Sequence, residues 1–166
     1  TLVATKMSNM GLEKYLNSND INLVRTNVGD RYVVEEMIKG GFNLGGEQSG
    51  HIIMSDFSTT GDGLVAALQF IAAMQRNQCS ASELLNVYDL YPQLLKNVQV
   101  SGDINPLTDS RIIKLIKDTE KKFGEKGRLY IRQSGTEPLI RVMGEHEDEV
   151  TLDHSINEII EQIKIL

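Results

Sequence analysis

The feature that most constrains this chain is an alternation of short β-like runs with helical runs over residues 2–78. Apolar, strand-like segments at 2–5 and 21–26 are each followed by a segment with helical periodicity, at 10–17 and 32–39. Such alternation is typical of βαβ units, in which helices cover the faces of a mostly parallel sheet. The sequence therefore predicts an α/β fold, with a βαβ-type mixed-sheet domain in the first part of the chain.

Glycines and capping residues indicate where the helices and strands of this domain begin and end. Gly40 and Gly41 follow the fourth segment, where a helix C-terminus favours residues that tolerate positive φ. A strand is expected at 52–54, and Asp62 is expected to cap a further helix. The apolar positions of that helix recur at helical spacing: Leu64, Leu68, Ile71 and Ala72.

A further helix is expected after residue 80. Ser80 and Glu83 have the spacing of a capping box, which predicts a helix to about Tyr88, and Pro92 then breaks the helical pattern. The character of the sequence changes from Val98, with a strand at 98–100 and a turn through Gly102 and Pro106.

The last third of the chain predicts a compact α+β domain. Strands are expected at 128–132 and 139–143, between two helices whose apolar positions share one face. These positions are Ile112, Leu115, Ile116, Thr119 and Phe123 in the first helix, which ends at Gly124, and Leu152, Ile156, Ile159, Ile160 and Ile163 in the second. We therefore expect two domains, at 1–90 and 97–166, joined by a short connection.

Composition excludes several classes of function. The formal net charge of the 166 residues is −6 and the lysines and arginines are dispersed, so a nucleic-acid partner is not expected. No membrane-length apolar run or signal-like segment is visible, and Cys79 has no second cysteine to pair with. These features predict a cytoplasmic protein without a membrane partner. No histidine adjoins Cys79, so we interpret it as a structural thiol.

The loop between the last two expected strands has the chemistry of an anion cradle. Arg132 and Arg141 supply permanent positive charge, Ser134 and Thr136 supply hydroxyls, and Gly135 frees the backbone. Guanidinium forks, hydroxyls and amides suit a phosphomonoester, which carries nearly two negative charges. The alternative is an ordinary turn, because serine, glycine and proline are common turn residues.

A second polar loop, at 45–51, reads Gly-Gly-Glu-Gln-Ser-Gly-His. Glu47, Ser49 and His51 stand at alternate positions and would project the same way from an extended loop. A carboxylate, a hydroxyl and an imidazole suit the vicinal hydroxyls and amine of an amino sugar. A plain surface loop is the alternative. One histidine and one carboxylate fall short of a metal ligand set, so no metal site is predicted.

Other polar residues have simpler interpretations. Asp30 is expected to cap the helix at 32–39, and Arg31 beside it is a candidate for the cleft. His146 and His154 lie among acidic residues and are interpreted as solvated surface.

Four strings together carry a resemblance to a known family. They are VGDRYV (28–33), GGEQSGH (45–51), TTGDG (59–63) and RQSGTEPLIRVM (132–143). In this order and spacing they resemble the phosphoglucosamine mutase branch of the α-D-phosphohexomutase family. The similarity runs over nearly the whole chain and matches the third and fourth domains of the family.

The resemblance implies roles for both loops. Glu47 and Ser49 would contact sugar hydroxyls, with His51 beside them. The segment around Asp30 and Arg31 stands where relatives acting on glucose or mannose phosphates usually show Gly-His. The phosphate that is not being transferred would be held by Arg132, Ser134, Gly135, Thr136 and Arg141.

The resemblance also implies a reaction. The family branch interconverts glucosamine 6-phosphate and glucosamine 1-phosphate through a phosphoserine relay, with glucosamine 1,6-bisphosphate as intermediate and Mg²⁺ as cofactor. Its product feeds UDP-N-acetylglucosamine and cell-wall synthesis. The phosphoserine loop and the magnesium loop of the family are absent from these residues. We therefore expect no catalytic residue and no metal ligand here, and no turnover by this chain alone.

Since Thr1 is not an initiating methionine, we expect the chain to belong to a larger protein. Its partners would be a sugar phosphate and the N-terminal domains of the same polypeptide, and the family commonly forms homodimers. Two alternatives remain open: a non-catalytic sugar-phosphate-binding module, and a phosphoglucomutase or phosphomannomutase of the same family.

Overall fold

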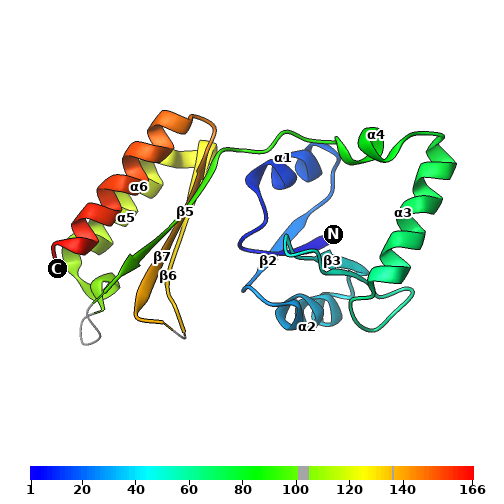
Figure 1. Ribbon diagram of the computed structural model, residues 1–166, viewed down its shortest axis with the longest axis horizontal. Helices are drawn as coiled ribbons and strands as arrows, with labels where there is room; N and C mark the ends of the chain where they lie inside the picture. Colours follow the sequence, from blue (N-terminus) through cyan, green and yellow to red (C-terminus); the bar gives the residue numbers. More distant parts are fainter. Residues whose placement is uncertain (101–104, 136) are drawn as a thin grey trace. The chain divides into compact units, whose positions relative to one another are not determined.

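The computed structural model describes residues 1–100, 105–135 and 137–166. They form two compact units, Thr1–Leu90 and Tyr91–Leu166 (Figure 1).

Unit 1 contains a four-stranded mixed sheet of order β2-β1-β3-β4. Strands β1, β2 and β3 run parallel, and β4 pairs antiparallel with β3. The predicted α/β class with a mixed sheet is confirmed, although the short strand β3 was not predicted. The elements are β1 (Leu2–Thr5), α1 (Met10–Ser18), β2 (Leu23–Thr26), α2 (Asp30–Gly40), β3 (Leu44–Gly46), β4 (Ile52–Met54), α3 (Gly63–Asn77) and α4 (Ala81–Leu85).

A small apolar core holds α2 against the sheet. It consists of Val3, Val33, Met37 and Ile53. A Cβ at Gly45 of β3 would lie 2.6 Å from both the Met37 sulfur and a Val33 methyl. Because only glycine leaves room for this close approach, Gly45 has a packing role that precedes any role in the polar loop.

Most helix ends in unit 1 lie where the capping and helix-ending residues of the sequence predict them. Gly41 closes α2 at φ +66°, and the Asp62 carboxylate accepts from the N–H groups of Leu64 and Val65 at the start of α3. Ser80 and Glu83 form the predicted capping box.

Two predicted helix boundaries are wrong. Helix α4 ends at Leu85 rather than near Tyr88. The N-cap of α2 is Gly29, at φ +129°, and Asp30 is already the first helical residue. The Asp30 carboxylate accepts from the N–H of its neighbour Arg31, so it does not supply the predicted cap.

Helix α3 has the predicted apolar spacing but lies exposed. None of its residues is buried, and the side chains of Leu64, Leu68 and Ile71 are among the exposed large hydrophobic residues of the chain. The apolar positions of α3 therefore add no buried residue to the core of unit 1.

Unit 2 is an antiparallel sheet of order β5-β7-β6, with helices α5 and α6 against one face (Figure 1). The α+β arrangement is as predicted, but β5 begins five residues before the expected strand at 98–100. The elements are β5 (Gln93–Gln99), η1 (Pro106–Thr108), α5 (Ser110–Phe123), η2 (Gly124–Lys126), β6 (Gly127–Gln133), β7 (Leu139–His146) and α6 (Glu149–Lys164). Gly102, in the predicted turn, lies outside the described residues.

The larger core of the chain lies between this sheet and its two helices. Its buried members are Val98, Ile112, Phe123, Ile140, Val142, Leu152, Ile156, Ile159, Ile160 and Ile163. These include most of the apolar positions predicted for the two helices, because a sustained 3.6-residue period defines one face.

One histidine prediction fails in unit 2. His146 is buried rather than solvated, and its ring lies 4.8 Å from that of Phe123. Its Nδ1 atom accepts from the Asp148 N–H at 2.9 Å. The acidic residues next to His146 in the sequence suggested an exposed segment, whereas His146 is the last residue of the buried strand β7. His154 on α6 is exposed as expected.

No helix in the described ranges combines the length and apolar character that crossing a lipid bilayer requires.

Gly144 offers a direct test of the packing between β7 and α6. A Cβ there would lie 2.6 Å from the Ile156 Cδ1 atom and 3.0 Å from the Leu152 Cδ1 atom. We predict that Gly144→Ala lowers the free energy of unfolding by about 1–3 kcal/mol, because overpacking forces the helix outward. Chemical denaturation measures this. Gly63→Ala is the control, since a Cβ at Gly63 meets no atom of the described residues within 4 Å. An equal loss in both variants would contradict the packing account.

Candidate functional site

The carboxyl ends of three parallel strands meet at one edge of the unit 1 sheet. Strands β1, β2 and β3 end at Thr5, Thr26 and Gly46. Ligands of α/β proteins commonly bind outside this edge, because the connecting loops gather there. The polar loop at 47–51 leaves β3 at this edge.

Glu47, Ser49 and His51 converge through a tight turn rather than an extended loop. The Glu47 N–H donates to the His51 carbonyl at 2.9 Å, and Gly50 takes φ +100°. The Ser49 hydroxyl lies 3.1 Å from His51 Nδ1 and 3.3 Å from Glu47 Oε2. His51 Nδ1 is itself 3.5 Å from Glu47 Oε2. One carboxylate, one hydroxyl and one imidazole therefore form a single hydrogen-bonding group.

Backbone at the start of α2 fixes the carboxylate of this group. Glu47 Oε1 accepts from the Gly29 N–H at 2.8 Å, close to the helix end where the macrodipole favours negative charge. The Glu47 side chain is only 8% exposed, whereas that of His51 is 57% exposed. The carboxylate is thus an anchored acceptor, and the imidazole is the part open to a ligand.

Arg31 is engaged elsewhere. Its side chain is 78% exposed, and its guanidinium pairs with Glu35, one helical turn along α2, at 2.8 Å. The hydrogen bond and the charge of Glu35 raise the pKa of Arg31. The guanidinium also lies over the Tyr32 ring. The contacts of Arg31 are therefore on α2, and a role toward a sugar stays a prediction.

Residues at the same edge were missed by sequence reasoning. Lys6, directly after β1, donates to Asn27 Oδ1, directly after β2, at 3.0 Å. Both line a hollow of about 410 Å³ together with Arg25, Thr26, Tyr32, Glu35, Glu36 and Lys39. In the sequence, only the positions of Lys6 and Asn27 could have indicated them as site residues, because each follows the carboxyl end of a predicted parallel strand.

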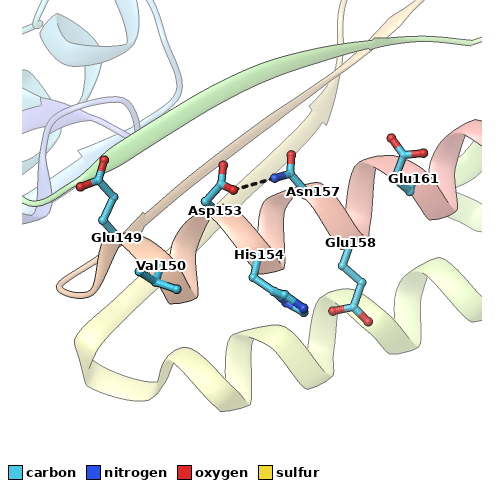
Figure 2. Close-up of a pocket in the computed structure, with 7 residues that line it drawn as sticks. All are labelled: Glu149, Val150, Asp153, His154, Asn157, Glu158 and Glu161. Atoms are coloured by element: carbon cyan, nitrogen blue, oxygen red, sulfur yellow. Dashed lines mark hydrogen bonds between the residues drawn. The ribbon is translucent and has the colours of Figure 1, made fainter.

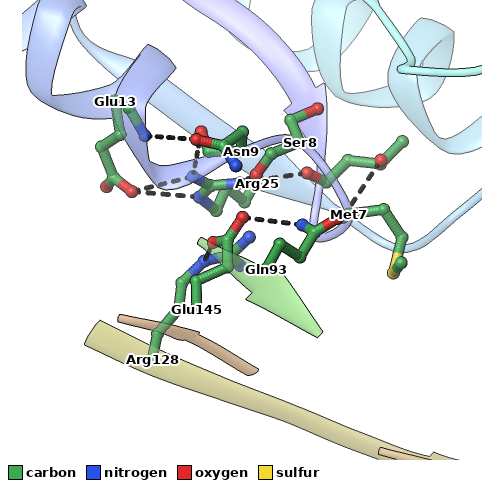
Figure 3. Close-up of polar contacts among 10 residues, drawn as sticks. Met7, Ser8, Asn9, Glu13, Arg25, Gln93, Arg128 and Glu145 are labelled. Atoms are coloured by element: carbon green, nitrogen blue, oxygen red, sulfur yellow. Dashed lines mark hydrogen bonds and ion pairs between the residues drawn. The ribbon is translucent and has the colours of Figure 1, made fainter. Parts of the chain in front are cut away.

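Arg25 holds this edge together. It donates to the carbonyl groups of Thr5 and Ser8, at 3.2 and 2.6 Å, and pairs with Glu13 of α1 at 2.9 Å (Figure 3). One side chain of β2 thus fixes the loop after β1 and the start of α1.

The second polar loop joins β6 to β7 in unit 2. Arg132 and Arg141 are direct partners in the antiparallel register, so their side chains leave the same face of the sheet. The Ser134 N–H donates to the Leu139 carbonyl at 2.8 Å, which closes the hairpin. Like charges placed directly opposite each other are unfavourable, and a bound anion would relieve that repulsion.

Arg141 is only partly satisfied by its neighbours. Its Nη2 atom lies 3.2 Å from Glu137 Oε2. Its Nε atom is buried and has no hydrogen-bonding partner in the described part of the chain. A buried donor without an acceptor is unfavourable, and the unused N–H therefore indicates an acceptor supplied from outside.

The remaining residues of this loop are placed as follows. Ser134 is buried. A Cβ at Gly135 would meet no atom of the described residues within 4 Å, so packing among those residues does not require a glycine there. Thr136, predicted as a hydroxyl donor, lies outside the described residues.

A buried carboxylate ties the three strands together near the other end of the same face. Glu145 of β7 is fully buried, with Arg128 of β6 at 2.5 Å and the Gln93 amide of β5 at 2.7 Å (Figure 3). Removing one partner of a buried ion pair is strongly destabilising. This contact therefore fixes the strand register on which the placement of Arg132 opposite Arg141 depends.

One hollow of unit 2 does not coincide with either polar loop. It has a volume of about 790 Å³ and follows one side of α6. Glu149, Asp153, Glu158 and Glu161 line it, with His154 and Asn157 between them (Figure 2). Its negative charge is unsuited to a phosphate ester.

A metal site does not emerge from these residues. Across residues 1–100, 105–135 and 137–166, no group of three or more histidine, cysteine, aspartate or glutamate side chains is placed to hold a metal ion. Glu47 and His51 alone do not complete a ligand set.

Comparison with protein families assigns both units. Residues 1–91 match the model "Phosphoglucomutase/phosphomannomutase, alpha/beta/alpha domain III". The chain belongs to the phosphoglucomutase/phosphomannomutase family. Residues 95–162 match the C-terminal domain of the same family, which agrees with the resemblance carried by the four sequence strings.

Curated relatives in this family lie close in sequence. The chain is 54% identical to a phosphoglucosamine mutase of Roseobacter denitrificans over 98% of its own length. It is 55% identical to a phosphoglucosamine mutase of Cereibacter sphaeroides over 99% of its length. It spans 36% and 37% of these two relatives.

Solved structures of the family share the fold. The structure of an N-acetylphosphoglucosamine mutase of Aspergillus fumigatus aligns with 98% of the present chain, with a TM-score of 0.82 and 19% identity. The aligned region is 38% of the Aspergillus chain. A second structure, of the Aspergillus enzyme in complex with GlcNAc-6P and magnesium, aligns with 96% of the present chain, with a TM-score of 0.77 and 19% identity. The aligned region is 40% of the Aspergillus chain. At this identity the likeness establishes the fold.

The partial pairing of Arg141 makes a prediction about Glu137. If the arginines hold an anion, Glu137 competes with it for Arg141 and repels it. We predict that Glu137→Gln tightens the binding of inorganic phosphate about two- to fivefold, which is the range expected for releasing one exposed ion pair. Isothermal titration calorimetry measures the affinity.

Glu147→Gln is the matched control for this change. It also removes one carboxylate and one exposed ion pair, with Lys126, but from the end of β7 remote from the hairpin. An equal gain in both variants would indicate a general charge effect and contradict the competition.

Proposed function

We propose that this chain supplies the sugar-binding and phosphate-binding parts of a phosphoglucosamine mutase. The complete enzyme would interconvert glucosamine 6-phosphate and glucosamine 1-phosphate. The observation that carries the proposal is the opposed pair Arg132 and Arg141, with a buried guanidinium N–H that has no acceptor among the described residues. The identity of about 54% to phosphoglucosamine mutases supports this choice of substrate.

The phosphate-binding part would act as a clamp. Two guanidinium groups on one sheet face can each offer a fork of N–H donors to a phosphate. In this proposal the hydroxyls of Ser134 and Thr136 and the backbone of Gly135 complete the clamp. The clamp recognises charge and not the ring, so it would accept a phosphate attached at either end of the sugar.

The sugar-binding part would read the ring. Glu47 accepts hydrogen bonds and carries negative charge, which suits hydroxyl groups and an ammonium group of an amino sugar. Ser49 and His51 add groups that donate or accept according to their partners. Since Gly29 holds the Glu47 carboxylate in place, its direction is set before a ligand arrives, which favours selective binding.

This division of labour fits a reaction through a bisphosphate. In the proposed relay, a phosphoserine elsewhere in the protein gives its phosphoryl group to the bound sugar phosphate and forms glucosamine 1,6-bisphosphate. The intermediate then turns and returns the other phosphoryl group. Arg132 and Arg141 hold the phosphate that is not being transferred in each step, and Glu47, Ser49 and His51 orient the ring.

Magnesium in such an enzyme would offset charge on the phosphoryl group in transfer. We assign its ligands to residues outside this chain, because the described side chains do not fit a magnesium site. The phosphorylated serine is assigned outside the chain as well. A cytoplasmic location, a homodimeric complete enzyme and a role in supplying UDP-N-acetylglucosamine complete the proposal.

A second candidate is a mutase for glucose or mannose phosphates. The family description itself favours it, since the matching models are named for phosphoglucomutase and phosphomannomutase. Turnover of the complete enzyme on amino and hydroxy sugar phosphates separates the two candidates. Preference for glucosamine 6-phosphate supports the first, and preference for glucose or mannose phosphate supports the second.

The clamp is tested by the double variant Arg132→Gln/Arg141→Gln. We expect the affinity of the chain for glucosamine 6-phosphate to fall at least about a hundredfold, because several hydrogen bonds to a charged group are lost. Calorimetry at fixed ionic strength measures this. Lys117→Gln/Lys121→Gln on α5 removes the same charge from exposed positions and should change the affinity less than twofold. Unchanged affinity in the arginine variant would refute the proposal.

The division of labour is tested by activity. The purified chain, incubated with glucosamine 6-phosphate, magnesium and glucose 1,6-bisphosphate, should yield no glucosamine 1-phosphate above background. A coupled assay or phosphorus NMR follows the product. Turnover that copurifies with the chain and disappears in the arginine double variant would show that the chemistry resides on these residues. A phosphate-binding module without any mutase partner would also be inactive, but adding the domains found in the relatives would not restore activity to it.

A further inference from the structure

The helix-free face of the unit 2 sheet carries a polar row that the hairpin motif does not include. Helices α5 and α6 cover the face formed by Val98, Ile140 and Val142. Side chains alternate between the faces along each strand. Asn97 and Arg141 therefore point to the other face, as does Arg132.

The strand register brings these three residues into one line. Asn97 of β5 is the direct partner of Arg141 in β7, and Arg141 is the direct partner of Arg132 in β6. Directly opposed residues have Cβ atoms about 4.5–5.5 Å apart. The guanidinium of Arg141 thus has Arg132 on one side and the Asn97 amide on the other.

The hydrogen-bonding capacity of this row is largely unused. Within the described ranges, the Asn97 and Arg132 side chains make no hydrogen bond or ion pair, and Arg141 Nε has no acceptor. Asn97 is exposed. Its neighbour Lys96, by contrast, points to the helix side and donates to Asn157 of α6 at 2.7 Å. The strand thus uses Lys96 for a hydrogen bond to α6, whereas the Asn97 side chain has no hydrogen-bonding partner among the described residues.

A phosphate ester bound by two arginines still has acceptor sites to satisfy. Its three terminal oxygens offer more lone pairs than two guanidinium forks fill. An asparagine amide adds a donor without adding charge or bulk, and it stands beside the arginine whose Nε lacks an acceptor.

We propose that Asn97 is a third phosphate-binding residue, whose Nδ2 donates to a terminal oxygen of the phosphate held by Arg132 and Arg141. This inference rests on the proposed function, since it extends the clamp from the hairpin to the neighbouring strand. The phosphate site then spans all three strands of the sheet. Its geometry depends on the pairing of β5 with β7 as well as on the loop.

The chain offers a matched control two residues away. Gln99 is also an exposed amide on β5, and it pairs with Leu139 rather than with an arginine. By strand periodicity it leaves the same face as Asn97, but one pleat further along. Substitutions at Gln99 therefore reproduce the change in chemistry without the neighbouring guanidinium.

The experiment compares these changes by titrating the chain with inorganic phosphate and with glucosamine 6-phosphate. Asn97→Ala should weaken both ligands about tenfold, as expected for one hydrogen bond to a charged group. Asn97→Val, which keeps a strong strand former, should do the same. Gln99→Ala should change either affinity less than twofold. Asn97→Asp should weaken binding more than Gln99→Asp, since its carboxylate stands beside Arg141. Thermal unfolding of each variant verifies folding.

The outcomes separate this inference from the proposed function. If the arginine double variant loses binding while Asn97→Ala and Asn97→Val stay within twofold of the unaltered chain, the role of Asn97 is refuted and the clamp stands. If the unaltered chain binds neither ligand, or if the arginine variant binds normally, both fail. Equal losses at Asn97 and Gln99 would indicate a general effect on β5 and would also overturn the assignment.

Discussion

The pairing of β6 with β7 is the constraint on which the candidate phosphate site depends. Only this register places Arg132 opposite Arg141, and a slip of one residue would send one of the two to the helix-covered face. Several independent contacts fix the register: the closed hairpin at Ser134, the buried Glu145 with its partners on both neighbouring strands, and Gly144 under α6. The opposed charges are thus held in place by packing and buried hydrogen bonds elsewhere in unit 2, not by their own interaction.

The candidate sugar site depends on backbone in a similar way. Glu47 follows strand β3, which can approach α2 only because Gly45 has no side chain. The Glu47 carboxylate accepts a hydrogen bond from the Gly29 N–H at the N-cap of α2. The same glycine-rich segment therefore packs against α2 through Gly45 and carries Glu47, which we propose binds the sugar. Arg25 stabilises the neighbouring loop through two carbonyl groups and Glu13. The polar side chains of the edge are set by hydrogen bonds that exist before any ligand binds.

Much of the fold could be predicted because its signals are local. The faces of α5 and α6, the cap at Asp62 and the capping box at Ser80 follow from periodicity and short-range hydrogen bonding. Strand β3 could not be predicted, since Leu44–Gly46 is three residues long and contains two glycines. His146 is buried beside Phe123, which is distant in sequence. The N-cap of α2 is Gly29, at a positive φ, where the usual preference for aspartate as a cap pointed to Asp30 instead. The candidate site was predicted where its residues form a continuous string, as in the loops at 45–51 and 132–141. Lys6, Asn27 and Asn97 were missed, because each is a single polar residue whose significance comes from strand pairing or from the edge that parallel strands share.

The central claim is that both polar loops bind one sugar phosphate. The most direct test is an NMR titration of the isotope-labelled chain with glucosamine 6-phosphate, with backbone amide shifts followed residue by residue. The account predicts saturable shifts at 47–51 and at 132–141 with one common dissociation constant, and the latter shifts alone with inorganic phosphate. Shifts confined to the acidic groove of α6, or two unrelated dissociation constants for the two loops, would contradict it.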